Sequence, residues 1–223
     1  MSQTKNKNLP KNRQYFRDIV KTVEDVDKEV AEGLRILDSV NRKIVSVFGT
    51  HATTNTDKFY KHCEETSYKL GLKKYAILTG GGPGIMKAAN TGAMRAKTVS
   101  IGFKAGLLKK EQSVENDIFT HQMSFKFLFA RRFSLAIKSH ALVFYPGGYG
   151  TLNELFEYVT LIQTHMVDPV PVVCVNKAYW EGLFKWLKTQ TMKKGYISSK
   201  HLQGIYFAET PEDVIKIIEK RAG

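Results

Sequence analysis

The sequence predicts an α/β protein with a Rossmann-like, doubly wound and mainly parallel sheet that carries helices on both faces. From residue 43 onward, short apolar runs rich in Val, Ile and Phe alternate with helical patterns. Such runs are typical of parallel strands that are buried on both faces. Two glycine-rich segments directly follow two of these runs. In open parallel sheets, ligands bind at the carboxyl ends of the strands, so these segments are the first candidates for a functional site.

The first 40 residues are expected to form a basic tail and an amphipathic helical extension to a catalytic domain that covers residues 41–223. Residues 14–40 place apolar side chains at three- and four-residue steps, which predicts one helix with a charged outer face. These side chains are Phe16, Ile19, Val23, Val26, Val30, Leu34 and Leu37. The tail before the helix concentrates basic residues, namely Lys5, Lys7, Lys11 and Arg13.

Six strands and six further helices are expected in the catalytic domain. The predicted strands cover residues 43–49, 75–79, 98–103, 141–145, 170–175 and 205–207. The helical patterns cover about residues 56–70, 84–97, 122–139, 150–166, 178–193 and 211–221.

Composition limits the class of protein. With 43% hydrophobic and 25% charged residues, the chain is expected to fold around a packed core. No apolar run approaches the ~18 residues that cross a bilayer, and the first residues lack the apolar stretch of a secretory signal. The two distant cysteines, Cys63 and Cys174, form no zinc pattern and indicate a reducing compartment. We therefore expect a cytoplasmic protein without a membrane partner.

The formal net charge of +13 could attract nucleic acid, a membrane surface or small anions. Residues 1–40 contain 8 Lys or Arg against 7 Asp or Glu, so a charge of +12 lies in residues 41–223. Only the short tail concentrates basic residues. A solvated basic surface or the steering of anions is expected, rather than nucleic-acid binding.

The first glycine-rich segment, Thr79 to Met86, contains three consecutive glycines and then Pro83 and Gly84. Glycines allow positive φ and a close approach of the backbone to a ligand, and the following helix start offers free N–H groups to an anion. The alternative is a plain strand-to-helix turn. The segment matches neither the phosphate-binding P-loop nor the dinucleotide fingerprint, which disfavours ATP and NAD.

The second segment, Pro146 to Glu154, repeats this arrangement after the strand at 141–145. The two segments are expected to face each other at one edge of the sheet, around a ligand with a phosphate and a polar ring. For Glu154, two roles remain open. It could be a catalytic carboxylate, or the last residue of a capping box that begins at Thr151.

Together the two segments resemble the LOG-type phosphoribohydrolases, a family often labelled "lysine decarboxylase". Residues 146–154 (PGGYGTLNE) match the family signature PGGxGTxxE, and residues 80–86 match its GGGxGxM segment. The similarity runs from about residue 43 to the C-terminus and includes residues 161–164 and Tyr179-Trp180. The helix before it resembles that of the longer, bacterial-type branch.

The resemblance implies Glu154 and Arg131 as the catalytic pair. Arg132 stands where the family has lysine, and the turn Gly49-Thr50-His51 also departs from the family pattern. All four of these residues are possible further contacts. The phosphoribose contacts expected from the two loops are Gly81, Gly82, Gly84, Met86, Gly147, Gly148, Tyr149, Gly150 and Thr151.

The implied reaction is hydrolysis of the N-glycosidic bond of a nucleoside 5′-monophosphate, such as AMP or another purine or cytokinin monophosphate. Glu154 would stabilise an oxocarbenium-like ribose or orient water, with Arg131 holding the carboxylate. No metal or cofactor is expected, and neither loop has the lysine that a pyridoxal phosphate enzyme needs. The alternative is a carrier of a nucleotide or phosphorylated pterin on the same fold.

The resemblance also implies a homodimer whose interface lies near the site. The stripe of Met123, Phe127 and Ala130, on the helix expected to carry Arg131, is the predicted contact surface.

Overall fold

A computed structural model describes residues 18–106, 108 and 113–221 of the chain. Within these residues, seven parallel strands form one sheet in the order β4-β3-β2-β1-β5-β6-β7. The strands are β1 (Ile44–Phe48), β2 (Ala76–Thr79), β3 (Ser100–Ala105), β4 (His121–Phe125), β5 (Ser139–Phe144), β6 (Val172–Val175) and β7 (Ile205–Ala208). The predicted Rossmann-like, doubly wound sheet is therefore confirmed.

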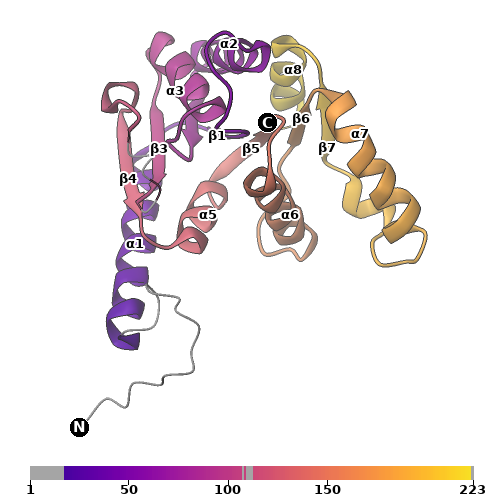
Figure 1. Cartoon of the computed structure of the whole chain (residues 1–223), viewed down its shortest axis with the longest axis horizontal. Coiled ribbons are helices and arrows are strands. Elements are labelled where there is room, and N and C mark those ends of the chain that lie inside the picture. The colour runs from indigo at the N-terminus through magenta and orange to yellow at the C-terminus, as the bar shows by residue number, and fades with distance from the viewer. Residues whose placement is uncertain (1–17, 107, 109–112, 222–223) are drawn as a thin grey trace.

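Helices cover both faces of this sheet (Figure 1). One face packs against α1 (Ile19–Ser39), α5 (Leu128–Ala136), α6 (Tyr149–Gln163) and α7 (Lys177–Trp186). The other face packs against α2 (Lys58–Leu72), α3 (Ile85–Arg95) and α8 (Pro211–Arg221). Short helical turns complete the description: η1 (Asn116–Ile118), the π-helical η2 (Leu187–Met192) and η3 (Ser199–Leu202).

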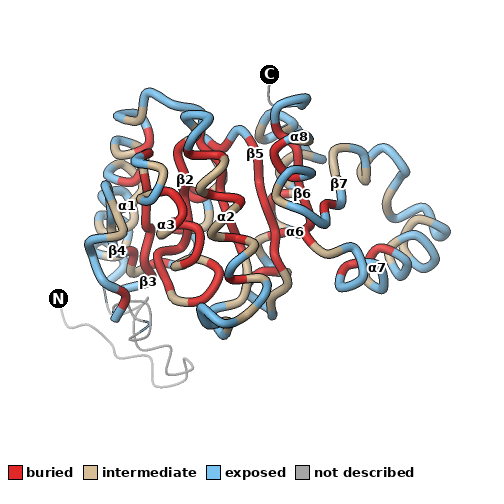
Figure 2. Tube along the Cα trace, turned by 90° about the horizontal axis from the view of Figure 1, so that it is seen from above, coloured by how far each residue is buried: buried red, intermediate tan, exposed pale blue. Residues whose placement is uncertain are grey.

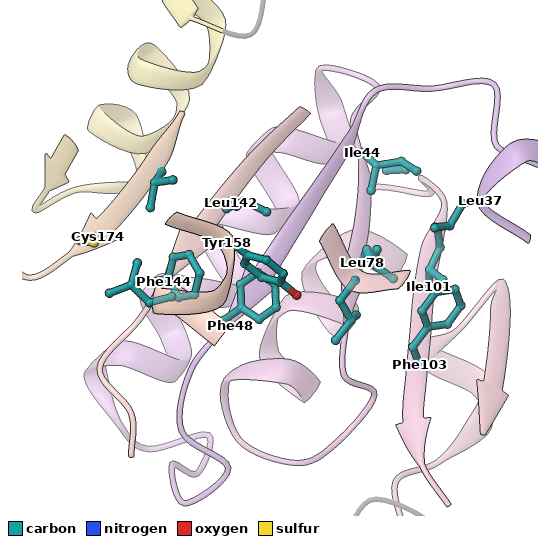
Figure 3. Packing of buried hydrophobic residues seen from close by; sticks show 14 of the residues in the cluster. Leu37, Ile44, Phe48, Leu78, Ile101, Phe103, Leu142, Phe144, Tyr158 and Cys174 are labelled. Carbon is teal, nitrogen blue, oxygen red and sulfur yellow. The ribbon is translucent and has the colours of Figure 1, made fainter. Parts of the chain in front are cut away.

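The strands form the buried centre of the molecule, which Figure 2 shows as a band of buried residues between exposed helices. On the α6 side, Phe48 and Phe144 stack with ring centroids 4.7 Å apart, and the Tyr158 ring lies 5.2 Å from Phe48 (Figure 3). These rings come from the carboxyl halves of β1 and β5 and from α6. They form a hydrophobic layer beneath the carboxyl ends of β1 and β5.

The strand order places a topological switch point between β1 and β5. The chain moves outward from β1 through β2 and β3 to β4, and then returns to pair β5 with the other side of β1. Loops that follow strands on the two sides of a switch point diverge, which leaves a crevice for a ligand. The second glycine-rich segment follows β5 directly at this point, and the first follows β2, on the other side of β1.

The predicted helix over residues 122–139 is wrong in its first part. Residues 121–125 form the edge strand β4, α5 covers only residues 128–136, and β5 already begins at Ser139. Met123, Phe125 and Phe127 are spaced by two, which is the period of a strand. Phe125 and Phe127 are fully buried, so tertiary packing selects the strand.

This correction removes the predicted dimer contact surface. Phe127 and Ala130 are buried in the core, and Met123 lies on β4 and packs against that core. Phe127 and Ala130 are covered within the chain and cannot also contact a partner, while Met123 is only partly buried. The exposed apolar residues of α5 are instead Leu128, Phe129 and Phe133.

The N-terminal helix is confirmed over residues 19–39, and Asp18 caps it by accepting a hydrogen bond from the Lys21 N–H. Its Glu29 carboxylate accepts from the N–H groups of Lys126 and Phe127, so α1 is fastened to the segment between β4 and α5. The basic tail, from Lys5 to Arg13, and the predicted helical position Phe16 lie outside the described residues. The division into an extension and a catalytic domain stays a prediction.

Candidate active site

A cavity of about 490 Å³ lies at the carboxyl ends of the central strands, at the switch point. It brings together loops after β1, β2 and β5 with the starts of α3, α5 and α6. Its lining consists of Val47, Phe48, Gly49, Thr50, His51, Gly80, Met86, Leu108, Leu128, Arg131, Arg132, Gly148, Tyr149, Gly150, Thr151, Asn153 and Glu154. Most of the residues predicted from the sequence therefore share one cavity.

The backbone of Thr50 joins the two glycine-rich loops. Its N–H donates to the carbonyl of Pro146 at 3.1 Å, and its own carbonyl accepts from the Ile85 N–H at 3.0 Å. Thr50 follows β1, which lies between the strands that carry the two loops. The three loops are thus fixed to one another by main-chain hydrogen bonds.

The second glycine-rich loop presents a helix start to the cavity. Helix α6 begins at Tyr149 with Gly148 as its N-cap, and its first turn contains no acidic residue. Gly148, Tyr149, Gly150 and Thr151 all line the cavity. Since the first N–H groups of a helix have no partner within it and the dipole is positive there, this end suits an anion such as phosphate.

The position of the N-cap decides between the two roles left open for Glu154. A capping box would need Thr151 as the N-cap, whereas Thr151 is the third residue of α6 and Glu154 is the sixth. Glu154 is therefore inside the helix, where the N–H groups already have helical partners. The capping-box interpretation is wrong, and the carboxylate lines the cavity instead.

Gly147 lies outside the cavity lining but is required for the loop. A Cβ added there would overlap Thr151 Oγ1 and would come within 3.0 Å of the Thr50 N atom. The loop carbonyl at Gly147 also accepts a hydrogen bond of 2.5 Å from the Tyr179 hydroxyl on α7. The loop is consequently held from two sides.

The first glycine-rich loop contributes less to the cavity than the sequence predicts. Gly80 and Met86 line it, while Gly81, Gly82 and Gly84 do not. Gly84 is the N-cap of α3 at φ 68°, packed against the Thr50 carbonyl. Because this carbonyl occupies the Ile85 N–H, the first donor of α3 points to protein and not to a ligand. Pro83 directly precedes this N-cap.

Arg131 is buried at the base of the cavity, with 7% of its surface exposed. Its Nε donates to the Phe103 carbonyl at 2.7 Å, and its Nη2 donates to the Gly80 carbonyl at 3.0 Å. Carbonyl partners offset the cost of burying a guanidinium. They also fix its plane, so Arg131 ties the end of β3 to the first glycine-rich loop.

Charges gather around Tyr158, beneath the cavity. Its hydroxyl donates to the Arg132 carbonyl at 2.9 Å. Burial, and then the negative charges of Glu154 and Glu157, raise the pKa of Tyr158 well above its ordinary value, while Arg131 and Arg132 act in the opposite direction. Glu157 also pairs with Arg132 at 2.5 Å. Two carboxylates and two guanidiniums therefore lie within electrostatic reach of one buried ring.

Several lining residues were not predicted from the sequence. Leu108 and Leu128 are exposed apolar side chains, and Asn153 is an exposed polar residue of the signature itself. Val47 and Phe48 are strand residues whose pattern indicates only a core. Gly80 could have been predicted to line the cavity, because it is the first of the three consecutive glycines.

Comparison with known proteins identifies the family. The family model described as "Possible lysine decarboxylase" matches residues 86–218, which is more than half of the chain. The chain belongs to this LOG family. Curated LOG relatives include the cytokinin riboside 5′-monophosphate phosphoribohydrolase LOG4 of Arabidopsis thaliana, which is 34% identical over 91 residues. That match covers 40% of this chain and 41% of the Arabidopsis protein.

A second curated LOG-type relative is the bifunctional cytokinin biosynthesis protein of Fusarium pseudograminearum, 35% identical over 77 residues. This match spans 34% of the present chain and 16% of the fungal protein. The chain thus matches less than half the length of these curated relatives.

Solved structures of similar fold include the molybdenum cofactor binding protein of Rippkaea orientalis, with a TM-score of 0.60 and 20% identity. That similarity covers 82% of this LOG-family chain and 98% of the other. The Moco carrier protein of Chlamydomonas reinhardtii has a TM-score of 0.56 and 21% identity, covering 81% and 97% of the two chains. These similarities support the fold.

Proposed function

We propose that the protein hydrolyses the N-glycosidic bond of a nucleoside 5′-monophosphate and releases the free base and ribose 5-phosphate. The observation that carries this proposal is the single cavity that contains Glu154, Arg131 and the N-terminal end of α6. A carboxylate and an anion-binding helix start within one cavity are what a phosphorylated ribose needs. Membership of the LOG family supports the same reaction class.

The roles follow from the positions. The 5′-phosphate binds the N–H groups at the start of α6, and Gly80 and Met86 contact the ribose. Glu154 faces C1′, where it stabilises the oxocarbenium-like transition state or orients the attacking water. Arg131 contributes a fixed positive charge at the base of the cavity, which favours the ionised carboxylate.

The phosphate requirement is the direct test. Hydrogen bonds to a charged acceptor contribute about 1.5–3 kcal/mol each, so losing two or three should cost on the order of 10³-fold in kcat/KM. Adenine release from AMP and from adenosine should be compared at equal concentration. Cleavage of adenosine within tenfold of AMP would contradict the phosphate assignment of the α6 loop. A panel of other nucleoside 5′-monophosphates in the same assay defines the preferred base.

A carrier function is the second candidate, because two structures of similar fold are named as molybdenum cofactor binding or carrier proteins. A carrier would bind its ligand in the same cavity without product formation. Single-turnover assays with AMP separate the two candidates, since only a hydrolase releases adenine. Among the described residues no lysine lines the cavity, which gives pyridoxal phosphate chemistry no support.

We also propose a cytoplasmic homodimer. Leu128, Phe129 and Phe133 on α5 and Phe156 on α6 are exposed by 37–51% of their surface. Leu128 also lines the cavity, so an interface on this face would border the site. Phe129→Glu with Phe133→Glu should shift the mass in light scattering from dimer to monomer. A wild-type monomer with full activity would contradict this proposal.

The cytoplasmic location is supported by the cysteines. Cys63 and Cys174 are both free and buried, in keeping with a reducing compartment.

A further inference from the structure

Residues 177–203 form a basic arm at the far edge of the sheet. The arm consists of α7, η2, a turn and η3, and it projects beyond the edge strand β7 in both views (Figures 1 and 2). It contains six lysines and one acidic residue, Glu181. The lysines are Lys177, Lys185, Lys188, Lys193, Lys194 and Lys200, and all six are exposed. The expectation that only the N-terminal tail concentrates basic residues is therefore wrong.

None of these six lysines forms an ion pair with another described residue. The cationic partners in the ion pairs lie elsewhere, on α2, α3 and α5 and in the segments next to them. Two of the arm lysines, Lys193 and Lys194, follow the helix end, where the helix dipole favours cations. Lys185 lies in the last turn of α7 and Lys200 in the last turn of η3, so the same effect applies to them. The dipole does not account for Lys177 and Lys188. Such a concentration of unpaired positive charge is typical of a surface that binds a polyanion.

Two aromatic rings are exposed among these lysines. Trp186 follows Lys185 and has 54% of its surface exposed, and Tyr196 follows the pair of lysines at the tip and has 73% exposed. The tip is an ordered turn, closed by the Gly195 N–H to Met192 O and the Tyr196 N–H to Thr191 O, both at 3.0 Å. Exposed rings that alternate with cations suit stacking on bases next to a phosphate backbone.

Four other apolar residues of the arm point inward, namely Trp180, Leu183, Phe184 and Leu187. Trp180 is fully buried and donates to the Val175 carbonyl, and Phe184 packs edge-on against Phe207 at 5.3 Å. Leu183 and Leu187 pack against the core. A helix that lies in a membrane interface needs a free apolar face. The arm uses that face to attach to the sheet, which favours nucleic acid over a lipid surface.

We propose that the basic arm binds single-stranded nucleic acid, with its lysines on the phosphates and with Trp186 and Tyr196 stacked on unpaired bases. This inference does not depend on the proposed hydrolase activity, because no arm lysine and neither ring lines the cavity. The base of the arm nevertheless contacts the α6 loop through the Tyr179 hydroxyl. A bound strand would therefore lie next to the site that handles mononucleotides.

The test is fluorescence anisotropy of the full chain with a labelled oligouridylate of about 20 nucleotides, a length that exceeds one binding site. Lys185, Lys188, Lys193 and Lys194 are changed together to Gln in the arm variant. The matched control changes four exposed lysines on other helices to Gln, namely Lys28, Lys61, Lys216 and Lys220. The two variants lose the same total charge, so they differ only in where that charge was located.

The wild-type chain should bind at low salt, with an affinity that falls by about 0.7 log units per log unit of salt for each phosphate contacted. The arm variant should lose on the order of 100-fold in affinity and most of the salt dependence. The control should stay within about threefold, because its lysines lie on α1, α2 and α8, where they do not contact a strand bound to the arm. Trp186→Ala and Tyr196→Ala should each weaken binding roughly tenfold. Thermal melting checks that every variant is folded.

Several outcomes would overturn the proposal. These are no binding of the oligouridylate at low salt, or an equal loss of affinity in the arm and control variants. Binding to phosphatidylserine vesicles without binding to the oligouridylate would assign the arm to a membrane surface instead. Equal affinity for a duplex, with no effect of the two aromatic substitutions, would remove the stacking part of the proposal.

Discussion

Replacing Glu154 with Gln removes a charge from the lining of the cavity and keeps the shape of the side chain. Glu154 is only partly buried and does not cap α6, so the variant should change the unfolding free energy by less than about 1 kcal/mol. Turnover of AMP should fall by roughly 10²-fold or more, which is the usual effect of losing an acid–base or electrostatic group. Adenine release and urea denaturation measure the two quantities.

Glu157→Gln is the matched control, because Glu157 lies on the same helix but outside the cavity lining. It forms the ion pair with Arg132, in which both side chains are 27% exposed. The control should lose up to about 1 kcal/mol of stability and keep nearly all of its turnover. If Glu154→Gln retains wild-type turnover while Glu157→Gln loses it, the assignment of the catalytic carboxylate is refuted.

Three further substitutions test the surroundings of the site. Arg131→Lys should lower the unfolding free energy by about 2–3 kcal/mol in urea denaturation, because lysine cannot reach both carbonyls; full stability and activity would contradict the anchoring role. Tyr179→Phe should raise KM for AMP several-fold and change kcat less, since it frees the carbonyl of Gly147; an unchanged KM would show that the hydrogen bond does not position the loop. Burial lowers the pKa of His62 below its ordinary 6.5, against the opposing effects of the Glu209 carbonyl and nearby carboxylates. The unfolded chain therefore takes up this proton first, so stability should fall as the pH drops below about 6.5. Between pH 7.5 and 5 the melting temperature should fall less for His62→Gln than for the wild type. Identical falls would show that His62 is not a source of the pH dependence of stability.

The sequence predicts the sheet, its helices and the place of the site because these depend on local periodicity and on chain order. Continuous apolar runs mark the central strands, and the glycines mark the carboxyl ends where ligands bind. Strand β4 was missed because residues 121–127 are followed without a break by an apolar helix. The two-residue spacing of their apolar side chains is then mistaken for part of a longer helical pattern. Only the burial of Phe125 and Phe127 distinguishes the strand from the helix.

Other features of the site depend on contacts that no local pattern contains. The carbonyl partners of Arg131 come from positions 28 and 51 residues away in the sequence. The spacing from Thr151 to Glu154 fits a capping box, but the true helix start depends on how the loop from Pro146 to Gly148 is fixed to Thr50. The charge of the basic arm was visible in the sequence, yet its exposure and its lack of partners were not.

The junction at Thr50 has a consequence for how this site could diversify. Its connections to both loops use main-chain atoms, and within the described part of the chain its side chain accepts a hydrogen bond from the nearby Ala52 N–H alone. Exchanges of the side chains at Thr50, His51 and Tyr149 therefore leave the backbone geometry of the loops in place while they alter the walls of the cavity. The loop backbone can thus stay constant while the side chains of the cavity wall vary. New substrates can therefore be acquired by point substitutions, without a change in the loop structure.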